Sequence, residues 1–225
     1  MQATPVEVPA RGGQRRVMQN MDTPSPVVLT GGIGSGKSSV GRLLSEWGAH
    51  VVDADLLARE VVGAGSAGLA AVVAAFGTGV LGPDGSLDRA RLADQVFNAP
   101  EQLAKLETII HPLVRSAASE QLGAQRDAPL LVYEVPLPGH SPFADSTVVV
   151  VVDAPDDVRR ERLRQRGLDP SQIEARMAAQ PSRAEWLALA DHVLDNGGDE
   201  PATLTQVASL WRELTGEEAP VSTGG

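Results

Sequence analysis

The segment that most constrains the fold is "GGIGSGKS" at residues 31–38, which matches the pattern G-x-x-x-x-G-K-[ST]. An apolar run at 27–30 precedes the match, and residues 38–47 follow it with apolar side chains at helical spacing. Glycines let successive backbone N–H groups converge on phosphate oxygens, and the N-terminus of the following helix adds a partial positive charge. A strand, this loop and a helix, in that order, therefore predict a site for a nucleoside triphosphate.

The side chains of this loop have expected roles of their own. Lys37 is predicted to reach the β- and γ-phosphates, and the Ser38 hydroxyl is predicted to bind Mg²⁺. Most of the ATP contacts are assigned to the loop and the first turn of the helix. The residues expected to bind ATP there are Gly32, Gly34, Ser35, Gly36, Lys37, Ser38 and Ser39.

Composition narrows the class of protein. The 225 residues, 42% of them apolar, can bury one substantial core. The absence of cysteine excludes disulfides and thiolate metal sites and fits a cytoplasmic location. A net charge of −10 argues against nucleic-acid binding. No apolar run approaches the roughly 20 residues of a membrane span, no secretory signal is evident, and nothing indicates an obligate protein partner.

Short apolar runs alternate with helical patterns, which is typical of a parallel sheet covered by helices. The expected strands are Val27–Thr30, Val51–Val52, Leu130–Val135, Thr147–Val152 and, more weakly, His192–Leu194. We expect a three-layer α/β/α fold with five parallel strands, within a domain at 26–215. Its core comprises 26–54, 128–158 and 191–215, and 1–25 and 216–225 are expected to be tails, the first of them disordered.

About 70 residues separate the second and third strands, although a crossover needs only about a dozen. Apolar residues at Leu69, Val72, Val73 and Phe76 repeat at helical spacing. Further helices are expected to begin near Asp88 and at Pro100. We therefore predict a helical insertion at 55–127 that binds a substrate.

The second strand ends in two carboxylates, Asp53 and Asp55, just before a helical pattern. We expect this strand to lie beside the first, with its C-terminal end opening onto the phosphate loop. One carboxylate there could accept the proton of an acceptor hydroxyl. The other could orient that base, contact Mg²⁺ through water, or cap the helix.

Arginines are concentrated between Arg159 and Arg183 in an otherwise acidic chain. A solvated helix with charge pairs at i,i+4 is one interpretation. The other, which the cluster favours, is a helical lid at 159–190 that faces the transferring phosphate. The chain lacks the Asn-Lys-x-Asp of GTPases and the signature segment of ABC-type ATPases. These features favour phosphoryl transfer to a small molecule.

Five motifs, "LTGGIGSGKS", "VDADLLAREVV", "DGSLDRARL", "IIHPLVR" and "DNGG", occur in an order and spacing that resemble the dephospho-CoA kinase family. The resemblance extends from about Val27 to Leu214. It implies a P-loop NTPase fold in which the insertion binds CoA and the arginine-rich segment is the lid. It also implies Mg²⁺- and ATP-dependent phosphorylation of the ribose 3′-hydroxyl of dephospho-CoA, the last step of coenzyme A synthesis.

The resemblance assigns roles to particular residues. Asp55, the second carboxylate of the D-x-D pattern, corresponds to the general base, and Arg59 would face the acceptor. Arg162 and Arg166 match the R-L-x-x-R of the lid. Arg162 is expected to stabilise charge in the transition state and Arg166 to bind substrate. Asn196 corresponds to the segment that lies against the adenine.

Other assignments stay open or depart from the family. Asp53 is placed with the acceptor-binding residues. His111 is either a turn residue that ends a helix before a proline or part of the acceptor pocket. The loop at 138–142 differs from the family, because Pro138 and His140 stand where Leu and Glu are usual. Glu134 before this loop is expected to hold Mg²⁺-bound water.

Trp186 stands where the lid often carries an arginine. It could stack on a base, although buried packing is the favoured interpretation. Two other functions stay open: a kinase for another nucleoside or nucleotide acceptor, and an ATP-binding module with little transfer activity.

Overall fold

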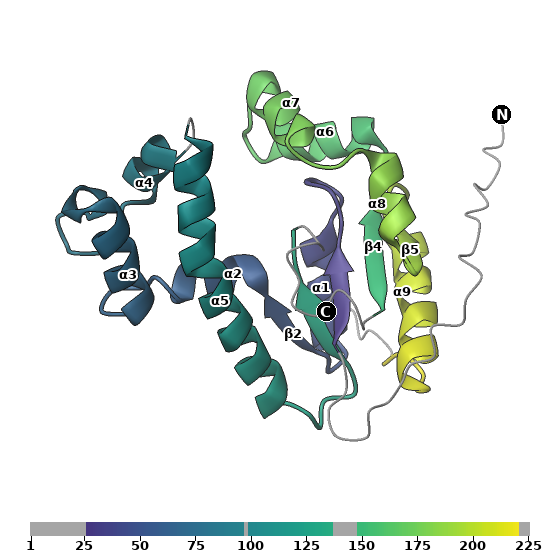
Figure 1. Cartoon of the computed structure of the whole chain (residues 1–225). Coiled ribbons are helices and arrows are strands. Elements are labelled where there is room, and N and C mark those ends of the chain that lie inside the picture. The colour runs from purple at the N-terminus through teal and green to yellow at the C-terminus, as the bar shows by residue number, and fades with distance from the viewer. Residues whose placement is uncertain (1–25, 97–98, 137–147, 221–225) are drawn as a thin grey trace.

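The computed structural model describes residues 26–96, 99–136 and 148–220. Five strands form a single sheet in the order β2-β3-β1-β4-β5, and every neighbouring pair is parallel (Figure 1). The strands are β1 (Val27–Thr30), β2 (His50–Asp53), β3 (Leu131–Glu134), β4 (Val149–Asp153) and β5 (His192–Asp195). The predicted five-stranded parallel α/β fold is confirmed.

The expected neighbour of β2 was wrong. β2 pairs with β3, Asp53 opposite Glu134, and β3 lies between β2 and β1. Burial explains this order, because every residue of β3 is buried and suits a central strand, whereas in β2 only Val52 is buried. The parallel register still brings the C-terminal ends of β2, β3 and β1 to one edge of the sheet.

Helices cover both faces of the sheet and complete three layers. α1 (Lys37–Glu46) and α9 (Glu200–Thr215) pack on one face, where Trp47 and Trp211 meet edge to face with ring centroids 5.9 Å apart. The C-terminal half of α5 (Pro100–Ala124) and α8 (Arg183–Leu189) pack on the other face. Trp186 of α8 is only 2% exposed, so the buried-packing interpretation is confirmed.

The insertion is helical, as the apolar periodicity predicts. It contains α2 (Ala54–Glu60), α3 (Ala67–Phe76), the short 3₁₀ helix η1 (Thr78–Val80), α4 (Arg89–Val96) and the start of α5. Its own small core is formed by Val62, Val72, Val80, Leu92 and Val96. Figure 1 shows these helices beyond the β2 edge of the sheet, on the side opposite α9.

α5 continues through Pro112 to Ala124, so the interpretation of His111 as a helix-ending residue was wrong. A proline inside a helix removes one backbone hydrogen bond. α5 stays helical across that point, and side chains on both sides of it, such as Leu106 and Leu122, pack into apolar clusters.

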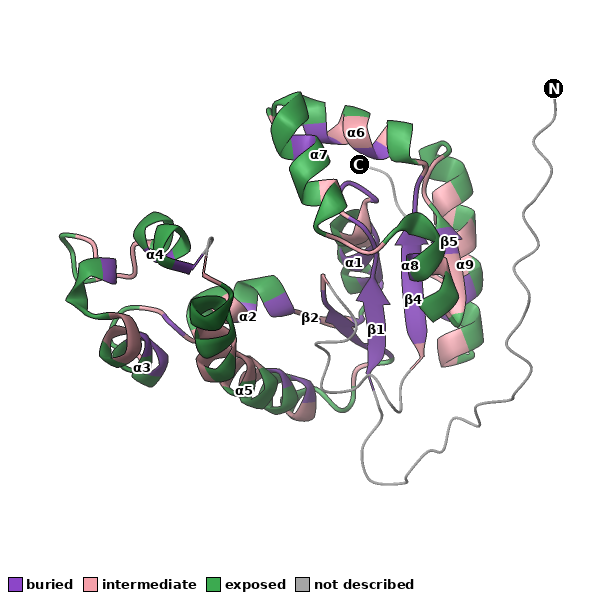
Figure 2. Ribbon diagram, turned by 45° about the horizontal axis from the view of Figure 1, so that its top comes forward, coloured by how far each residue is buried: buried purple, intermediate pink, exposed green. Residues whose placement is uncertain are grey.

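α6 (Asp156–Gln165) and α7 (Pro170–Ala178) follow β4 and lie above the sheet edge at which the strands end (Figures 1 and 2). Arg160 of α6 joins the two helices through both of its hydrogen bonds to Glu174 of α7. In Figure 2 the strands are largely buried, while α6 and α7 present many exposed residues. None of the helices in the described part of the chain is long and apolar enough to cross a membrane.

Two predictions lie outside the described residues: the disordered tail at 1–25 and the altered loop at 138–142.

Candidate active site

The phosphate loop joins the end of β1 to the start of α1. Gly34 and Gly36 have φ values of 81° and 94°, a left-handed conformation that favours glycine. Gly36 caps α1, and the Ser35 N–H donates to the Gly32 carbonyl at 3.0 Å. The loop therefore turns tightly into the helix N-terminus, the geometry expected of an anion-binding site.

Side chains from outside the loop hold its carbonyl groups. Arg159 of α6, 4% exposed, donates from Nε to the Ile33 carbonyl at 2.9 Å. Arg162 donates to the Ser35 carbonyl at 3.1 Å and to the Asn196 carbonyl at 2.7 Å. Asn196 donates from Nδ2 to the same Ser35 carbonyl at 2.7 Å. These hydrogen bonds hold the Ile33 and Ser35 carbonyl groups of the loop in place.

The segment that follows α7 also contacts the loop, at one of the loop's N–H groups. Gln180, which follows α7, accepts a hydrogen bond from the Ile33 N–H at 2.7 Å. At the end of β4, Asp153 accepts two hydrogen bonds at 3.0 Å from Nε of Arg183 and one at 2.6 Å from its Nη2. These contacts connect the phosphate loop and the sheet to the segment between α6 and α8.

Glu134, at the end of β3, lies against the first turn of α1. Its Oε1 accepts from the Ser38 hydroxyl at 2.9 Å and lies 3.1 Å from Lys37 Nζ. The residue is 4% exposed, and its Oε2 would be 2.6 Å from a Cβ added at Gly41. A glycine at that position in α1 thus makes room for the carboxylate.

A hydroxyl and a carboxylate side by side are the oxygen ligands that Mg²⁺ prefers, so Ser38 and Glu134 fit this ion. Among the residues that the structure describes, no group of three or more His, Asp or Glu could hold a metal by itself.

Asp53 and Asp55 have different surroundings. Asp53 is the N-cap of α2, and its Oδ1 accepts from the backbone N–H groups of Asp55 at 2.7 Å and Leu56 at 3.2 Å. The Asp55 carboxylate is exposed and accepts no hydrogen bond from another described residue. The capping alternative is thus confirmed for Asp53, while Asp55 is left available to a ligand.

Tyr133 of β3 lies near both carboxylates. The pKa of its hydroxyl is raised first by burial and then by the negative charges of Asp53 and Asp55, while Arg115 of α5 lowers it. Charged groups at the end of β2, in the first turn of α2 and on α5 therefore all act on the same hydroxyl at β3.

The cap at Asp53 gives a test of its structural role. We expect Asp53→Ala to lower the free energy of unfolding by about 1 kcal/mol, because two helix N–H groups lose their acceptor. Asp53→Asn should change it much less, since asparagine caps equally well. Urea denaturation of the three proteins measures the difference. Equal stability of all three would contradict the capping role.

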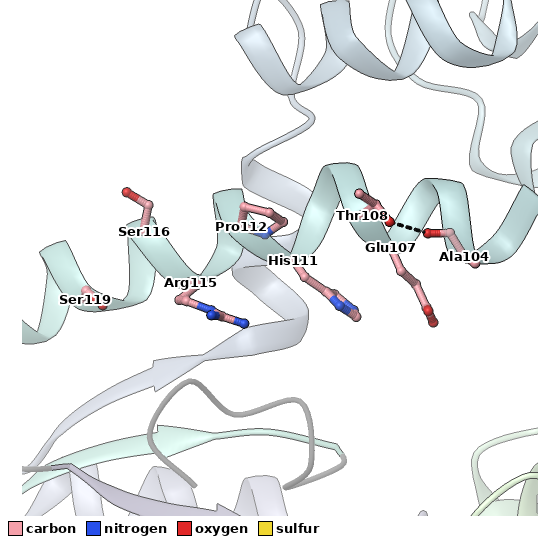
Figure 3. Close-up of a pocket in the computed structure, with 8 residues that line it drawn as sticks. All are labelled: Ala104, Glu107, Thr108, His111, Pro112, Arg115, Ser116 and Ser119. Atoms are coloured by element: carbon pink, nitrogen blue, oxygen red, sulfur yellow. Dashed lines mark hydrogen bonds between the residues drawn. The ribbon is translucent and has the colours of Figure 1, made fainter. Parts of the chain in front are cut away.

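The residues predicted to bind the acceptor lie in different surroundings. His111 and Arg115 line a cavity of about 730 Å³ along α5 (Figure 3). Arg59 of α2 and Arg166 at the end of α6 are exposed, and neither side chain bonds another described residue. The structure thus places Arg162 and Asn196 at the loop and leaves Arg59 and Arg166 free at the surface.

Sequence reasoning assigned no role to Arg159, Gln180 or Arg115. Arg159 is one of several arginines in α6, and only burial distinguishes it. The available signal was its spacing from Leu163, because both fall on the buried stripe of α6. Arg115 follows His111 by one helical turn, and that spacing could have indicated a shared face.

The family model for dephospho-CoA kinase matches residues 26–201 of this chain. A dephospho-CoA kinase of Thermobifida fusca (strain YX) is 47% identical over 190 residues, covering 84% of this chain and 95% of the relative. One of Streptomyces avermitilis is 49% identical over 193 residues, covering 84% and 93%. A crystal structure from Thermus thermophilus is 36% identical, with a TM-score of 0.75, and covers 86% of this chain and 99% of that one.

Proposed function

This chain belongs to the dephospho-CoA kinase family, and we propose that it transfers the γ-phosphoryl group of ATP to the ribose 3′-hydroxyl of dephospho-CoA. The products are coenzyme A and ADP. The observation that carries this proposal is the pairing of Asp53 with Glu134 in neighbouring strands. It sets an exposed carboxylate, Asp55, at the same sheet edge as the phosphate loop.

The donor side would use the loop and its neighbours. Backbone N–H groups of 32–39 and the ammonium group of Lys37 would hold the phosphates of ATP. Mg²⁺ would be held by the Ser38 hydroxyl and, through water, by Glu134, and would neutralise charge on the phosphates. Asn196 would lie against the adenine, which agrees with its hydrogen bond to the Ser35 carbonyl.

On the acceptor side, Asp55 would take the proton of the 3′-hydroxyl as its oxygen attacks the γ-phosphorus. The bond from phosphorus to the bridging oxygen of ADP would break in the same step. Asp53, Arg59, His111 and Arg166 would bind the acceptor or its phosphates. Arg162 would stabilise the transferring charge, for which its present bonds to the Ser35 and Asn196 carbonyls hold it next to the loop.

The experiment combines purified protein, ATP, Mg²⁺ and 3′-dephospho-CoA, and follows coenzyme A by mass. Adenosine and AMP are tested as acceptors in parallel. We expect Mg²⁺-dependent formation of coenzyme A that exceeds transfer to either competitor. Preferred transfer to adenosine or AMP would indicate a kinase for another acceptor, and ATP binding without any transfer would indicate a nucleotide-binding module. As an enzyme of coenzyme A synthesis without cysteine, it is also expected in the reducing cytoplasm.

A further inference from the structure

One face of α5 carries a row of polar side chains, of which the proposed reaction so far uses only His111. Glu107, His111, Arg115 and Ser119 follow one another at intervals of four residues, the spacing of neighbours on a helix surface. Figure 3 shows Glu107, His111 and Arg115 extending from the same side of the helix along the cavity. The row therefore forms one polar wall of the cavity, and Arg115 supplies its permanent positive charge.

Arg115 belongs to the helix that packs against β2 and α2, the two elements that carry Asp53 and Asp55. Its positive charge and the negative charges of Asp53 and Asp55 all act on the Tyr133 hydroxyl and shift its pKa in opposite directions. Yet among the described residues Arg115 forms no ion pair and its side chain makes no hydrogen bond. An exposed guanidinium group thus stands near the acceptor side of the site, and no described residue serves as its counter-ion.

The proposed acceptor has a matching charge. In dephospho-CoA the ribose that carries the 3′-hydroxyl also carries a diphosphate at its 5′ position, so a single sugar ring separates the two groups. A guanidinium group binds phosphate oxygens in pairs through its planar array of N–H donors. The Ser119 hydroxyl, one turn beyond Arg115 in the same row, offers a further donor. Glu107 lies two turns from Arg115, at the other end of the row, and its negative charge would repel the diphosphate.

We propose that Arg115 binds the 5′-diphosphate of dephospho-CoA while the 3′-hydroxyl lies at Asp55. This inference rests on the proposed function and adds to it the part of the substrate that the insertion recognises. It gives the insertion a role in acceptor selection, because adenosine has the same ribose hydroxyl but no diphosphate. A nucleoside would therefore reach the base without the contact to Arg115.

The test compares wild-type protein with Arg115→Ala and Arg115→Lys. We expect Arg115→Ala to raise the KM for dephospho-CoA about ten- to hundredfold, the effect of losing a hydrogen-bonded charge pair. The kcat and the KM for ATP should change little. Arg115→Lys should fall between the two, since lysine keeps the charge but loses the paired geometry. Arg42→Ala, which removes an exposed arginine from α1, is the matched control.

Two further readouts separate binding of the diphosphate from a structural role. The inhibition constant of adenosine against dephospho-CoA, at saturating ATP, should be the same in wild type and Arg115→Ala. Added salt should raise the KM for dephospho-CoA more in wild type than in Arg115→Ala, because salt screens an exposed charge contact. A structural role would change adenosine inhibition as well and would leave the salt dependence unaltered.

The outcomes distinguish the two proposals. If wild-type protein forms no coenzyme A, the proposed function fails and this inference fails with it. If wild type forms coenzyme A but the KM for dephospho-CoA is unchanged in Arg115→Ala, only the inference is overturned. A variant with lower kcat, or weaker adenosine inhibition, and an unchanged KM also overturns it.

Discussion

Asp55→Asn is expected to lower kcat for coenzyme A formation by about 10²- to 10⁴-fold, the usual contribution of a general base. The amide has nearly the shape of the carboxylate but cannot accept the proton of the 3′-hydroxyl. Affinity for ATP should persist, because Asp55 lies in the first turn of α2, after β2, whereas the phosphate loop follows β1 and β3 separates the two strands. Stability should also persist, since the Asp55 carboxylate is exposed and holds no helix N–H group.

Steady-state kinetics with dephospho-CoA, together with calorimetric titration of ATP, measures both expectations. Glu60→Gln is the matched control, because it neutralises another exposed carboxylate on α2. If Asp55→Asn turns over at the wild-type rate, Asp55 is not the base. Asp53 would then become the candidate, and Asp53→Asn, which keeps the cap, would test it without loss of the helix N-terminus.

Local sequence patterns predicted most of the fold. β1 begins and ends at the predicted residues, and Pro100 is the first residue of α5 as expected. The order of the strands was not predictable in the same way. It depends on the path of the long crossover between β2 and β3 and on how deeply each strand is buried. No local pattern in β2 shows that β3, and not β1, is its neighbour.

In the site, too, features set by local sequence were predictable and features set by packing were not. The phosphate loop was predictable because its glycines, lysine and serine act through local backbone geometry. Residue chemistry alone could not distinguish the two aspartates, since either can cap a helix or accept a proton, and only the resemblance to the family favoured Asp55 as the base. The arginines of α6 also look alike in sequence. Only packing shows that Arg159 is buried beneath the loop while Arg166 is exposed.

Lys37→Met is expected to have two separate effects. Turnover should fall by about 10²- to 10³-fold, the typical loss of one preorganised donor to developing charge. The free energy of unfolding should fall by roughly 3 kcal/mol, because Glu134 would keep a buried charge without its cation. The Lys37 and Glu134 side chains are only 14% and 5% exposed, so solvent compensates little. Steady-state kinetics and urea denaturation measure the two effects.

The double variant Lys37→Met/Glu134→Gln separates them. The neutral amide no longer needs a cation and still accepts the hydrogen bond from the Ser38 hydroxyl, so most of the lost stability should return. Turnover should stay low, because nothing replaces the ammonium group at the phosphates. Arg42→Met, which removes an exposed cation from the same helix, controls for net charge. If the double variant instead regains turnover, Lys37 acts mainly by neutralising Glu134, and the phosphates are held by the loop backbone and the lid.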